Sequence, residues 1–328
     1  MSPVDRVRIA LIGAGRMGSV HLRALRASDA VEVAAVVEPA AAARQAVAVS
    51  GLKVYEEVDG FLNDAEADGV LISAPSDQHP ALVSKFAEAG LPILCEKPVG
   101  VKSADASSAK EAADRAGILL QVGYWRRFVP ELRALRERIC AGDLGEIIQL
   151  SCMQWDAAPP SSQFRAHSGG IAVDMGVHEF DQTRWLLDQE FTWVAALGTG
   201  SSSAPSAPPS DPDNATILAR LSGGAAATVS LGRHFPHADS CWVEVWGTEG
   251  YARLPFLWDA DVWGASSDPV FVAAMVAQVE AFAETIRGGT REGADGEDAV
   301  AALKVAARVA ESLGETAIVA PERLAATP

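Results

Sequence analysis

Short apolar runs alternate with alanine-rich amphipathic stretches over residues 6–122. The apolar runs predict strands, because parallel strands covered on both faces read as continuous apolar segments. The predicted strands are Val7–Ile12, Val31–Val37, Gly69–Ser73, Pro92–Cys95 and Ile118–Val122. The predicted helices are Met17–Ala27, Ala40–Ser50, Pro80–Ala89 and Ser103–Ala116. This alternation is typical of an α/β architecture with a doubly wound parallel sheet.

The pattern changes after a further predicted helix at Pro130–Ala141. The later strands are predicted at 146–155, Thr192–Leu197, Ala215–Leu221, Ala225–Leu231 and Cys241–Trp246, and two closing helices at Phe271–Arg287 and Gly296–Leu313. Several of these strands alternate with period two, which predicts an α+β region with a large, mostly antiparallel open sheet. Residues 199–213, rich in Ser and Pro, predict a hairpin loop within it.

One strand shows the alternation clearly. Cys241, Val243 and Val245 would face the core, and Trp242, Glu244 and Trp246 the other side. A face that carries tryptophans is either a subunit interface or a solvated surface, and both interpretations stay open. The first interpretation predicts a homodimer or a homotetramer.

Charge and composition restrict the class of protein. The chain has 328 residues, 49% of them hydrophobic, and a formal net charge of -16. Such an acidic chain is not expected to bind nucleic acid or anionic lipid. We also expect no apolar stretch of the roughly 18 to 20 residues that a membrane span needs. The four dispersed cysteines, without a CxxC pair, fit reduced thiols in a cytoplasm.

A glycine-rich motif follows the first strand and opens the first helix. In Gly13-Ala14-Gly15-Arg16-Met17-Gly18, the first glycine permits a tight turn, the second lets the backbone approach a pyrophosphate, and the third lets helix and strand pack closely. The helix N-terminus offers N–H groups to the phosphates. The pattern therefore predicts an N-terminal Rossmann domain over residues 1–123 that binds a nicotinamide dinucleotide.

The acid at the end of the second strand bears on which dinucleotide binds. Glu38 stands twenty residues past Gly18 and is placed to accept hydrogen bonds from the ribose hydroxyls. Pro39, not an arginine, follows it, which favours NAD over NADP. Arg44 lies nearby, so use of NADP stays open. The alternative is that Glu38 only ends a surface strand.

Two more strand ends belong to the same edge of the sheet, where ligands of such sheets bind. Ser73-Ala74-Pro75 follows one strand and Glu96-Lys97-Pro98 the next; Glu96 and Lys97 could equally form a surface ion pair. The residues expected to line the cofactor are Gly13, Gly15, Arg16, Met17, Gly18, Glu38, Ser73, Ala74, Pro75, His79, Glu96 and Lys97.

The densest set of candidate chemical groups lies between residues 169 and 185. If this stretch is one helix, Asp174, His178 and Asp181 share a face at i, i+4 and i+7. Histidine suits removal of a hydroxyl proton near neutral pH, a neighbouring carboxylate can orient it, and a lysine can stabilise an alkoxide. Gly176 would cost about 1 kcal/mol in a helix unless a ligand or another backbone approaches it.

Other interpretations of these groups stay open. A lone helical histidine is more often a packing residue, and an Asp/His/Asp face could bind a metal, but neither a second histidine nor a cysteine supports a metal here. In the segment Tyr124-Trp125-Arg126-Arg127-Phe128, the arginines could bind substrate hydroxyls or a carboxylate, or brace the junction between the domains.

Taken together, these motifs resemble the Gfo/Idh/MocA oxidoreductase family over nearly the whole chain. The shared elements are the motif at 13–18 with His21 beyond it, Glu96-Lys97-Pro98, residues 123–128 and residues 174–181. The resemblance implies a second domain, 124–328, that binds substrate and often mediates oligomerisation, and whose last helix can pack back on the Rossmann domain. It also implies a catalytic set of Lys97, Asp174 and His178, and often a cis bond before Pro98.

Within the family, the sequence is most similar to the inositol 2-dehydrogenase branch. This similarity implies an NAD-dependent oxidation of a secondary hydroxyl of a polyol or sugar, with myo-inositol as the first candidate. The residues expected to contact the substrate are Tyr124, Arg127, Gln154 and Asp181. The alternatives are an aldose or glycoside dehydrogenase, a hydrolase or lyase that recycles bound NAD, and a regulatory protein without catalysis. The segment Gln154–His167 matches no subgroup securely.

Overall fold

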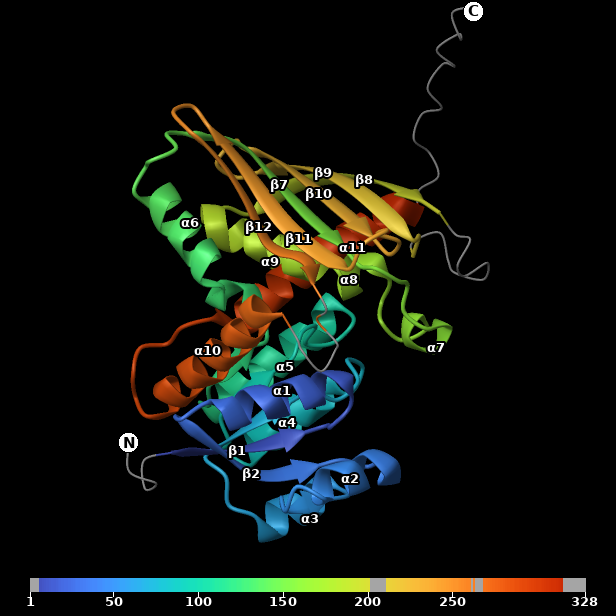
Figure 1. Cartoon of the computed structure of the whole chain (residues 1–328), viewed down its shortest axis with the longest axis vertical. Helices are drawn as coiled ribbons and strands as arrows, with labels where there is room; N and C mark the ends of the chain where they lie inside the picture. The colour runs from blue at the N-terminus through green and yellow to red at the C-terminus, as the bar shows by residue number, and fades with distance from the viewer. Residues whose placement is uncertain (1–5, 201–210, 261, 263–267, 315–328) are drawn as a thin grey trace, which may run out of the picture.

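Two β-sheets lie one above the other along the long axis of the molecule, each with helices against it (Figure 1). The computed structural model describes residues 6–200, 211–260, 262 and 268–314. The lower sheet belongs to the N-terminal half of the chain and the upper sheet to the C-terminal half, as the change of pattern near residue 130 predicts.

The lower sheet is a doubly wound parallel sheet with one exceptional edge strand. Its order is β13-β6-β5-β4-β1-β2-β3, and only β13 runs antiparallel to its neighbour. The strands are β1 (Val7–Ile12), β2 (Val31–Val37), β3 (Val54–Tyr55), β4 (Gly69–Ile72), β5 (Ile93–Cys95), β6 (Leu120–Val122) and β13 (Ala294–Asp295). The helices are α1 (Arg16–Ala27), α2 (Ala41–Ala48), α3 (Val58–Asp64), α4 (His79–Glu88) and α5 (Ser103–Ala116). Every predicted element is present, while the short β3, β13 and α3 were not predicted.

The chain returns to this sheet after it has built the second domain. Helix α10 (Pro269–Ile286) packs against α1, and Phe282 and Ile286 fill the space beside Gly69, where a Cβ atom would lie 2.9 Å from the Ile286 side chain. By length and composition alone α10 is apolar enough to cross a membrane, which is weak evidence, because core helices of the same length share this property. Its fully buried Gln278 and its packing on α1 are those of a core helix.

The upper sheet is open and mostly antiparallel, as predicted. Its order is β12-β11-β7-β10-β9-β8, and only β7 and β10 pair in parallel. The strands are β7 (Ile147–Trp155), β8 (Phe191–Thr199), β9 (Asn214–Leu221), β10 (Ala226–Gly232), β11 (Asp239–Gly247) and β12 (Tyr251–Ala260), of which β12 was not predicted. Strands β8 and β9 are antiparallel neighbours, so residues 199–213 join a hairpin, although 201–210 lie outside the described residues.

Helices cover one face of the upper sheet. The helices of this domain are α6 (Pro130–Cys140), α7 (Ser162–Arg165), α8 (Ile171–Asp174), α9 (Gly176–Leu187) and α11 (Gly296–Gly314). Of these, α6, α9 and α11 pack against strands, and Figure 1 shows α9 and α11 beneath the sheet. The alternation predicted for β11 is confirmed, because Cys241, Val243 and Val245 are buried. The opposite face exposes large apolar side chains, among them Ile148, Trp193, Leu197, Leu218, Tyr251 and Trp258.

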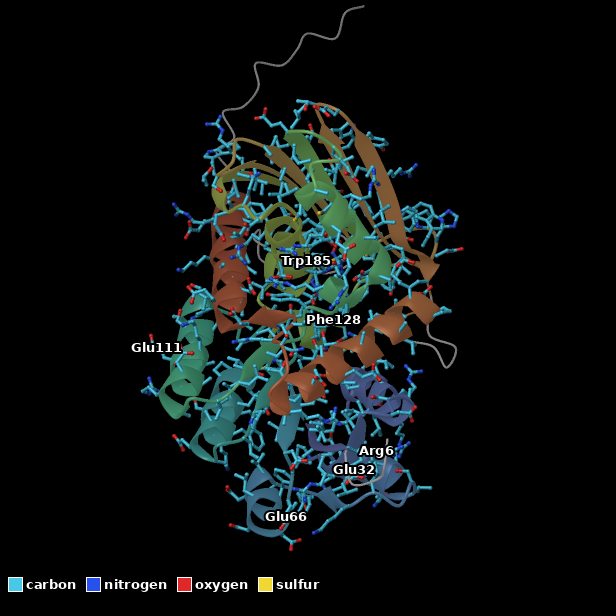
Figure 2. All side chains as sticks on the ribbon, turned by 90° about the vertical axis from the view of Figure 1, so that its left-hand side faces the viewer. Arg6, Glu32, Glu66, Glu111, Phe128 and Trp185 are labelled. Atoms are coloured by element: carbon cyan, nitrogen blue, oxygen red, sulfur yellow. The ribbon has the colours of Figure 1, made fainter. Side chains whose placement is uncertain are left out.

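The two domains are joined by a short 3-10 helix, η2 (Trp125–Phe128), and by α11, which contacts both α5 below and α9 above. Helix α11 therefore links helices of both domains. The Arg133 guanidinium lies 5.0 Å from the Phe128 ring and that of Arg136 lies 5.5 Å from the Trp185 ring. Figure 2 shows Phe128 where the domains meet and Trp185 above it.

Candidate active site

The glycine-rich turn between β1 and α1 has the geometry that a pyrophosphate requires. Gly13 has a φ of 93°, and a Cβ atom there would lie 2.8 Å from the Ser73 carbonyl oxygen. A Cβ on Gly18 would lie 2.2 Å from the Gly13 carbonyl oxygen, so helix and strand touch there. Gly15, the N-cap of α1, has open space above it, and Arg16 and Met17 begin the helix. The loop therefore fits the dinucleotide expected from the sequence.

Glu38 is buried beside this turn. Its carboxylate accepts hydrogen bonds from the Ala14 N–H at 2.6 Å and from the Ala40 N–H at 2.8 Å. Each carboxylate oxygen can accept a further bond, so the position fits ribose hydroxyls and not a mere strand end. Arg44 binds the carbonyl oxygens of Glu38 and Pro39 and the Glu56 carboxylate, so a 2′-phosphate would have to compete for it.

The end of β4 supports the turn from the other side. The Ser73 hydroxyl donates to the Gly13 carbonyl oxygen at 2.8 Å, and Ala74 and Pro75 continue the edge. The His79 ring lies 2.8 Å from the carbonyl oxygens of both Ala74 and Pro98, and burial lowers its pKa. His79 is 1% exposed and ties the two loops together, and its place beside the cofactor stays a prediction.

Glu96 has the same kind of supporting role. It is buried, its carboxylate lies 2.6 Å from the His21 ring nitrogen Nε2, and it accepts the Lys97 N–H at 3.0 Å. The alternative of a surface ion pair between Glu96 and Lys97 is wrong, because Glu96 is buried against His21, while its place beside the cofactor stays a prediction. The pair links α1 of the glycine motif to the loop that carries Lys97, and it therefore holds that lysine in place.

Lys97 reaches across to the second domain. Its Nζ donates to the main-chain oxygen of Asp174 at 2.7 Å, and the Lys97–Pro98 peptide is cis, as the resemblance implies. The Asp174 carboxylate lies 3.4 Å from Arg233, a fully buried arginine that also binds Asp211. Lys97 and Asp174 are therefore brought together, although they are 77 residues apart in the sequence.

The expectation of one helix through residues 174–181 is wrong. The helix breaks at Met175, so Asp174 ends α8 while His178 lies on α9. Among the described residues no hydrogen bond joins Asp174 to His178. Gly176 is explained by packing, because a Cβ there would lie 2.9 Å from the Phe180 ring, and no ligand needs to approach it.

His178 lies in an aromatic environment with one ring nitrogen unpaired. Its ring makes edge contacts with Tyr124 and Trp125, at centroid distances of 6.0 and 6.4 Å. Burial lowers the pKa of His178 well below 6.5, and the charges of Lys97 and Arg126 lower it further. Its Nδ1 is buried and has no partner among the described residues. The ring is thus neutral at neutral pH, which is the form that accepts a proton.

The two arginines of η2 brace the junction, which decides between the two interpretations of that segment. Arg127 makes two hydrogen bonds to Asp181, at 2.6 and 3.0 Å, and a third contact to Asp298 at 3.0 Å. Arg126 makes a single hydrogen bond to the buried Glu179, at 2.5 Å, and a second one to Gln154 at 2.9 Å. Asp181 is 1% exposed and its carboxylate is paired with Arg127, so these two side chains brace the junction, and their contact with a substrate stays a prediction.

The two other expected substrate contacts have different surroundings. Tyr124 is 1% exposed, and its hydroxyl has no partner among the described residues. The Gln154 side-chain oxygen accepts a hydrogen bond from Arg126 at 2.9 Å, which directs its amide nitrogen toward Asp156, 3.5 Å away. Gln154 is therefore held by Arg126 on one side and faces Asp156 on the other, and its contact with a substrate stays a prediction.

Two charged residues that the sequence analysis missed enter the site from strand ends. Asp156 follows β7 and Arg233 follows β10. Burial, and then the charges of Asp239 and Asp174, raise the pKa of Asp156 to about 7. Both positions obey the rule already applied to Lys97, that a polar residue directly after a strand lies at the sheet edge, and this signal could have found them. The described residues contain no group of three side chains that could hold a metal.

Comparison with known proteins agrees with this geometry. Residues 7–124 match the sequence profile of an oxidoreductase family with an NAD-binding Rossmann fold, and residues 132–253 match the GFO/IDH/MocA C-terminal domain. The rhizopine catabolism protein MocA of Rhizobium meliloti is 48% identical over 94% of this chain and 96% of its own length. The scyllo-inositol 2-dehydrogenase (NAD(+)) of Bacillus subtilis (strain 168) is 31% identical over 87% of both chains.

A solved structure shows the same arrangement of domains. The myo-inositol dehydrogenase from Corynebacterium glutamicum superimposes with a TM-score of 0.84 at 29% identity, over 94% of this chain and 96% of its own. The glycine-rich turn, the Lys97–Asp174 contact and these similarities along nearly the whole chain lead to one conclusion. The chain belongs to the Gfo/Idh/MocA family of oxidoreductases, and its N-terminal domain is an NAD-binding Rossmann domain.

Proposed function

We propose that the protein is an NAD-dependent dehydrogenase that oxidises a secondary hydroxyl group of a cyclic polyol or sugar, with an inositol as the first candidate. The observation that carries this proposal is the meeting of Lys97 with Asp174 beside a buried, neutral His178 whose Nδ1 has no partner. The relatives named above as inositol dehydrogenases support the substrate class.

Different residues bind the cofactor and transfer the proton. Gly13, Gly15 and the N-terminus of α1 hold the pyrophosphate, and Glu38 binds the ribose. When bound, NAD supplies the acceptor for the hydride of the carbon that is oxidised. His178 accepts the proton of the reacting hydroxyl, and the charge of Lys97 stabilises the oxygen as that proton leaves.

Asp174 is a positioning residue in this proposal. Its main-chain oxygen holds Lys97 Nζ, and its carboxylate is in turn held by Arg233. A role for the Asp174 carboxylate toward His178 would require a rotation of its side chain away from Arg233. We further propose that the enzyme works in the cytoplasm as a homo-oligomer, since the cysteines are free and the outer face of the upper sheet exposes large apolar side chains.

The test is NADH formation by the purified protein with NAD or NADP and a panel of inositols, aldoses and glycosides. Oxidation of one or more inositols with NAD supports the proposal and the role of Glu38. Oxidation of aldoses alone would keep the mechanism and replace the substrate class. Tight NAD binding with no net NADH from any of them, but with cleavage of a glycoside, would replace it by a hydrolase or lyase that recycles its cofactor.

A further inference from the structure

The helical turn that carries Asp174 depends on support from other segments. Helix α8 has four residues; it follows two glycines with positive φ, Gly169 at 79° and Gly170 at 83°, and it breaks at Met175. A single helical turn is marginal by itself, because one hydrogen bond does not offset the entropy that its nucleus loses. The position of Asp174 is therefore set by the contacts that α8 makes with the rest of the domain.

One buried carboxylate, that of Asp211, is connected to both ends of this turn. Its Oδ1 accepts the N–H of Ile171, the first residue of α8, at 2.8 Å. The same oxygen accepts a hydrogen bond from Arg233 Nη1 at 2.8 Å, and Arg233 Nη2 lies 3.4 Å from the Asp174 carboxylate. Asp211 thus holds the start of α8 directly and the end of α8 through one arginine.

The Asp211 side chain is itself fixed by the last residue of α7. Arg165 Nε donates to Asp211 Oδ2 at 2.8 Å, and Arg165 Nη2 donates to the Asp211 main-chain oxygen at 2.6 Å. Arg165 Nη1 binds the carboxylate of the nearby Asp213 at 2.8 Å. Three donors around the Asp211 carboxylate, two of them charged, set its orientation, because charge-assisted hydrogen bonds are strong and directional.

Stability alone does not explain Arg233. Its side chain is fully buried, and its Nε has no partner among the described residues. A buried charge and an unpaired donor both cost free energy, and an apolar side chain of similar volume often stabilises a fold more. What Arg233 and Asp211 do provide is a fixed place for the Asp174 main-chain oxygen, which accepts a hydrogen bond from Lys97 Nζ at 2.7 Å.

We propose that Asp211 and Arg233 are positioning residues for the oxidation. They hold α8 where the Asp174 main-chain oxygen keeps Lys97 beside the reacting hydroxyl, and neither of them touches the substrate. A displacement of about 1 Å that originates away from the chemistry can cost roughly 10²-fold in rate, so these contacts matter to turnover. This inference rests on the proposed function and adds two residues to it.

The experiment compares Asp211→Asn and Arg233→Met with Asp213→Asn as a matched control. Asp213 is also buried and pairs with the same Arg165, whereas the bonds to α8 and to the Arg233 guanidinium are made by Asp211. Arg233→Lys is the conservative variant, because lysine keeps the charge and loses the fork that joins two carboxylates. If Arg233→Met does not fold, Arg233→Lys takes its place in the comparison.

We expect Asp211→Asn and Arg233→Met to lower kcat about 10- to 100-fold, while the Kd of NAD stays within about twofold. Arg233→Lys should recover part of the lost kcat. Asp213→Asn should keep kcat within about threefold, although its midpoint of chemical denaturation falls as far as that of Asp211→Asn. An equal loss of kcat in Asp213→Asn, or an unchanged kcat in the other two variants, overturns the proposal.

A second measurement needs no turnover. Lys97 is partly exposed, and its Nζ is held by the Asp174 main-chain oxygen. Its rate of reductive methylation by formaldehyde and a borane, followed by peptide mass spectrometry, reports how firmly it is held. The exposed Lys304 on α11 serves as the internal standard in every protein.

We expect Asp211→Asn and Arg233→Met to raise the relative methylation rate of Lys97 about fivefold or more, as the loss of one hydrogen bond allows. Asp213→Asn should leave this rate unchanged. If NAD binds but no polyol or sugar is oxidised, the proposed function is wrong, and the methylation rates still test the two residues. An increase confined to the Asp211 and Arg233 variants supports their hold on Lys97, and equal rates in all the proteins overturn it.

Discussion

The cofactor half and the substrate half of the site are built from different parts of the chain. The cofactor half uses the main chain: the turn at Gly13, the close contact at Gly18 and the N–H groups that hold Glu38 all come from short segments. The substrate half uses side chains from distant segments, such as Lys97 with Asp174 and Arg127 with Asp181. A site made from the main chain is visible as a motif, whereas a site made from distant side chains is visible only once the fold is known.

The largest expected effect concerns His178, the proposed base of the substrate half. His178→Ala should lower kcat about 10²- to 10⁴-fold, because the base is removed. NAD binding should stay within about twofold, since the cofactor half does not use this ring. Steady-state kinetics and a titration with NAD measure the two quantities. A variant that loses NAD binding and turnover together would mean that His178 supports the fold of both halves.

The second prediction tests whether Arg127 and Asp181 brace the structure. Asp181→Asn should lower the free energy of unfolding by about 3 kcal/mol, because it leaves a buried guanidinium with fewer partners. Chemical denaturation measures this change. The double variant Arg127→Met, Asp181→Leu should recover part of the loss, since no buried charge is left without its partner. If Asp181→Asn instead raised KM and left the free energy of unfolding unchanged, the result would indicate that Asp181 contacts the substrate.

The third prediction separates two glycines of the cofactor half. Gly18→Ala should lower the free energy of unfolding by about 1–3 kcal/mol and weaken NAD binding, because its Cβ atom would meet the Gly13 carbonyl oxygen. Gly15→Ala should change stability by only about 0.5 kcal/mol, since its Cβ atom would meet no atom within 4 Å. It should still weaken NAD binding by roughly tenfold or more, as the added methyl group lies where the pyrophosphate approaches. Equal losses of stability in the two variants would contradict this geometry.

The smallest predicted effect is a shift in titration. Burial and the charge of Lys97 lower the pKa of His178, so its ring should stay neutral as the pH falls through 6.5 and gain a proton only below that. Lys97→Met removes a repulsive charge and should raise this pKa. Nuclear magnetic resonance of the ring nitrogens measures it in both proteins without any need for activity. A ring that is protonated at pH 6.5 in the wild type would argue against its role as the base.

The sequence predicted the cofactor half well for a physical reason. Each glycine of 13–18 and the acid at Glu38 has a role set by local geometry, and the strand and helix around them have strong apolar patterns. The side chains of His79 and Glu96 turn inward, where they lie against a carbonyl oxygen and a histidine, and the sequence did not indicate these contacts. Strand ends place a residue at an edge but do not set the direction of its side chain.

For the substrate half, the sequence indicated candidate residues but not the contacts between their side chains. A helical wheel places Asp174, His178 and Asp181 on one face. In the structure the break at Met175 puts Asp174 on a different helix from His178, and Asp181 is hydrogen-bonded to Arg127. Neither the break nor the partner has a local signal, because both depend on how α8 and α9 pack between sheet and junction. Asp156 could have been predicted, since it directly follows a strand.

The return of the chain to the first sheet has an evolutionary consequence. Strand β13 completes the edge of the Rossmann sheet, and α10 supplies Val279 and Phe282 to the core beneath β1. The first domain is therefore not complete without the end of the chain. A recombination event that joined residues 1–123 to a new partner would expose the apolar surface covered by α10 and leave the edge of β6 unpaired.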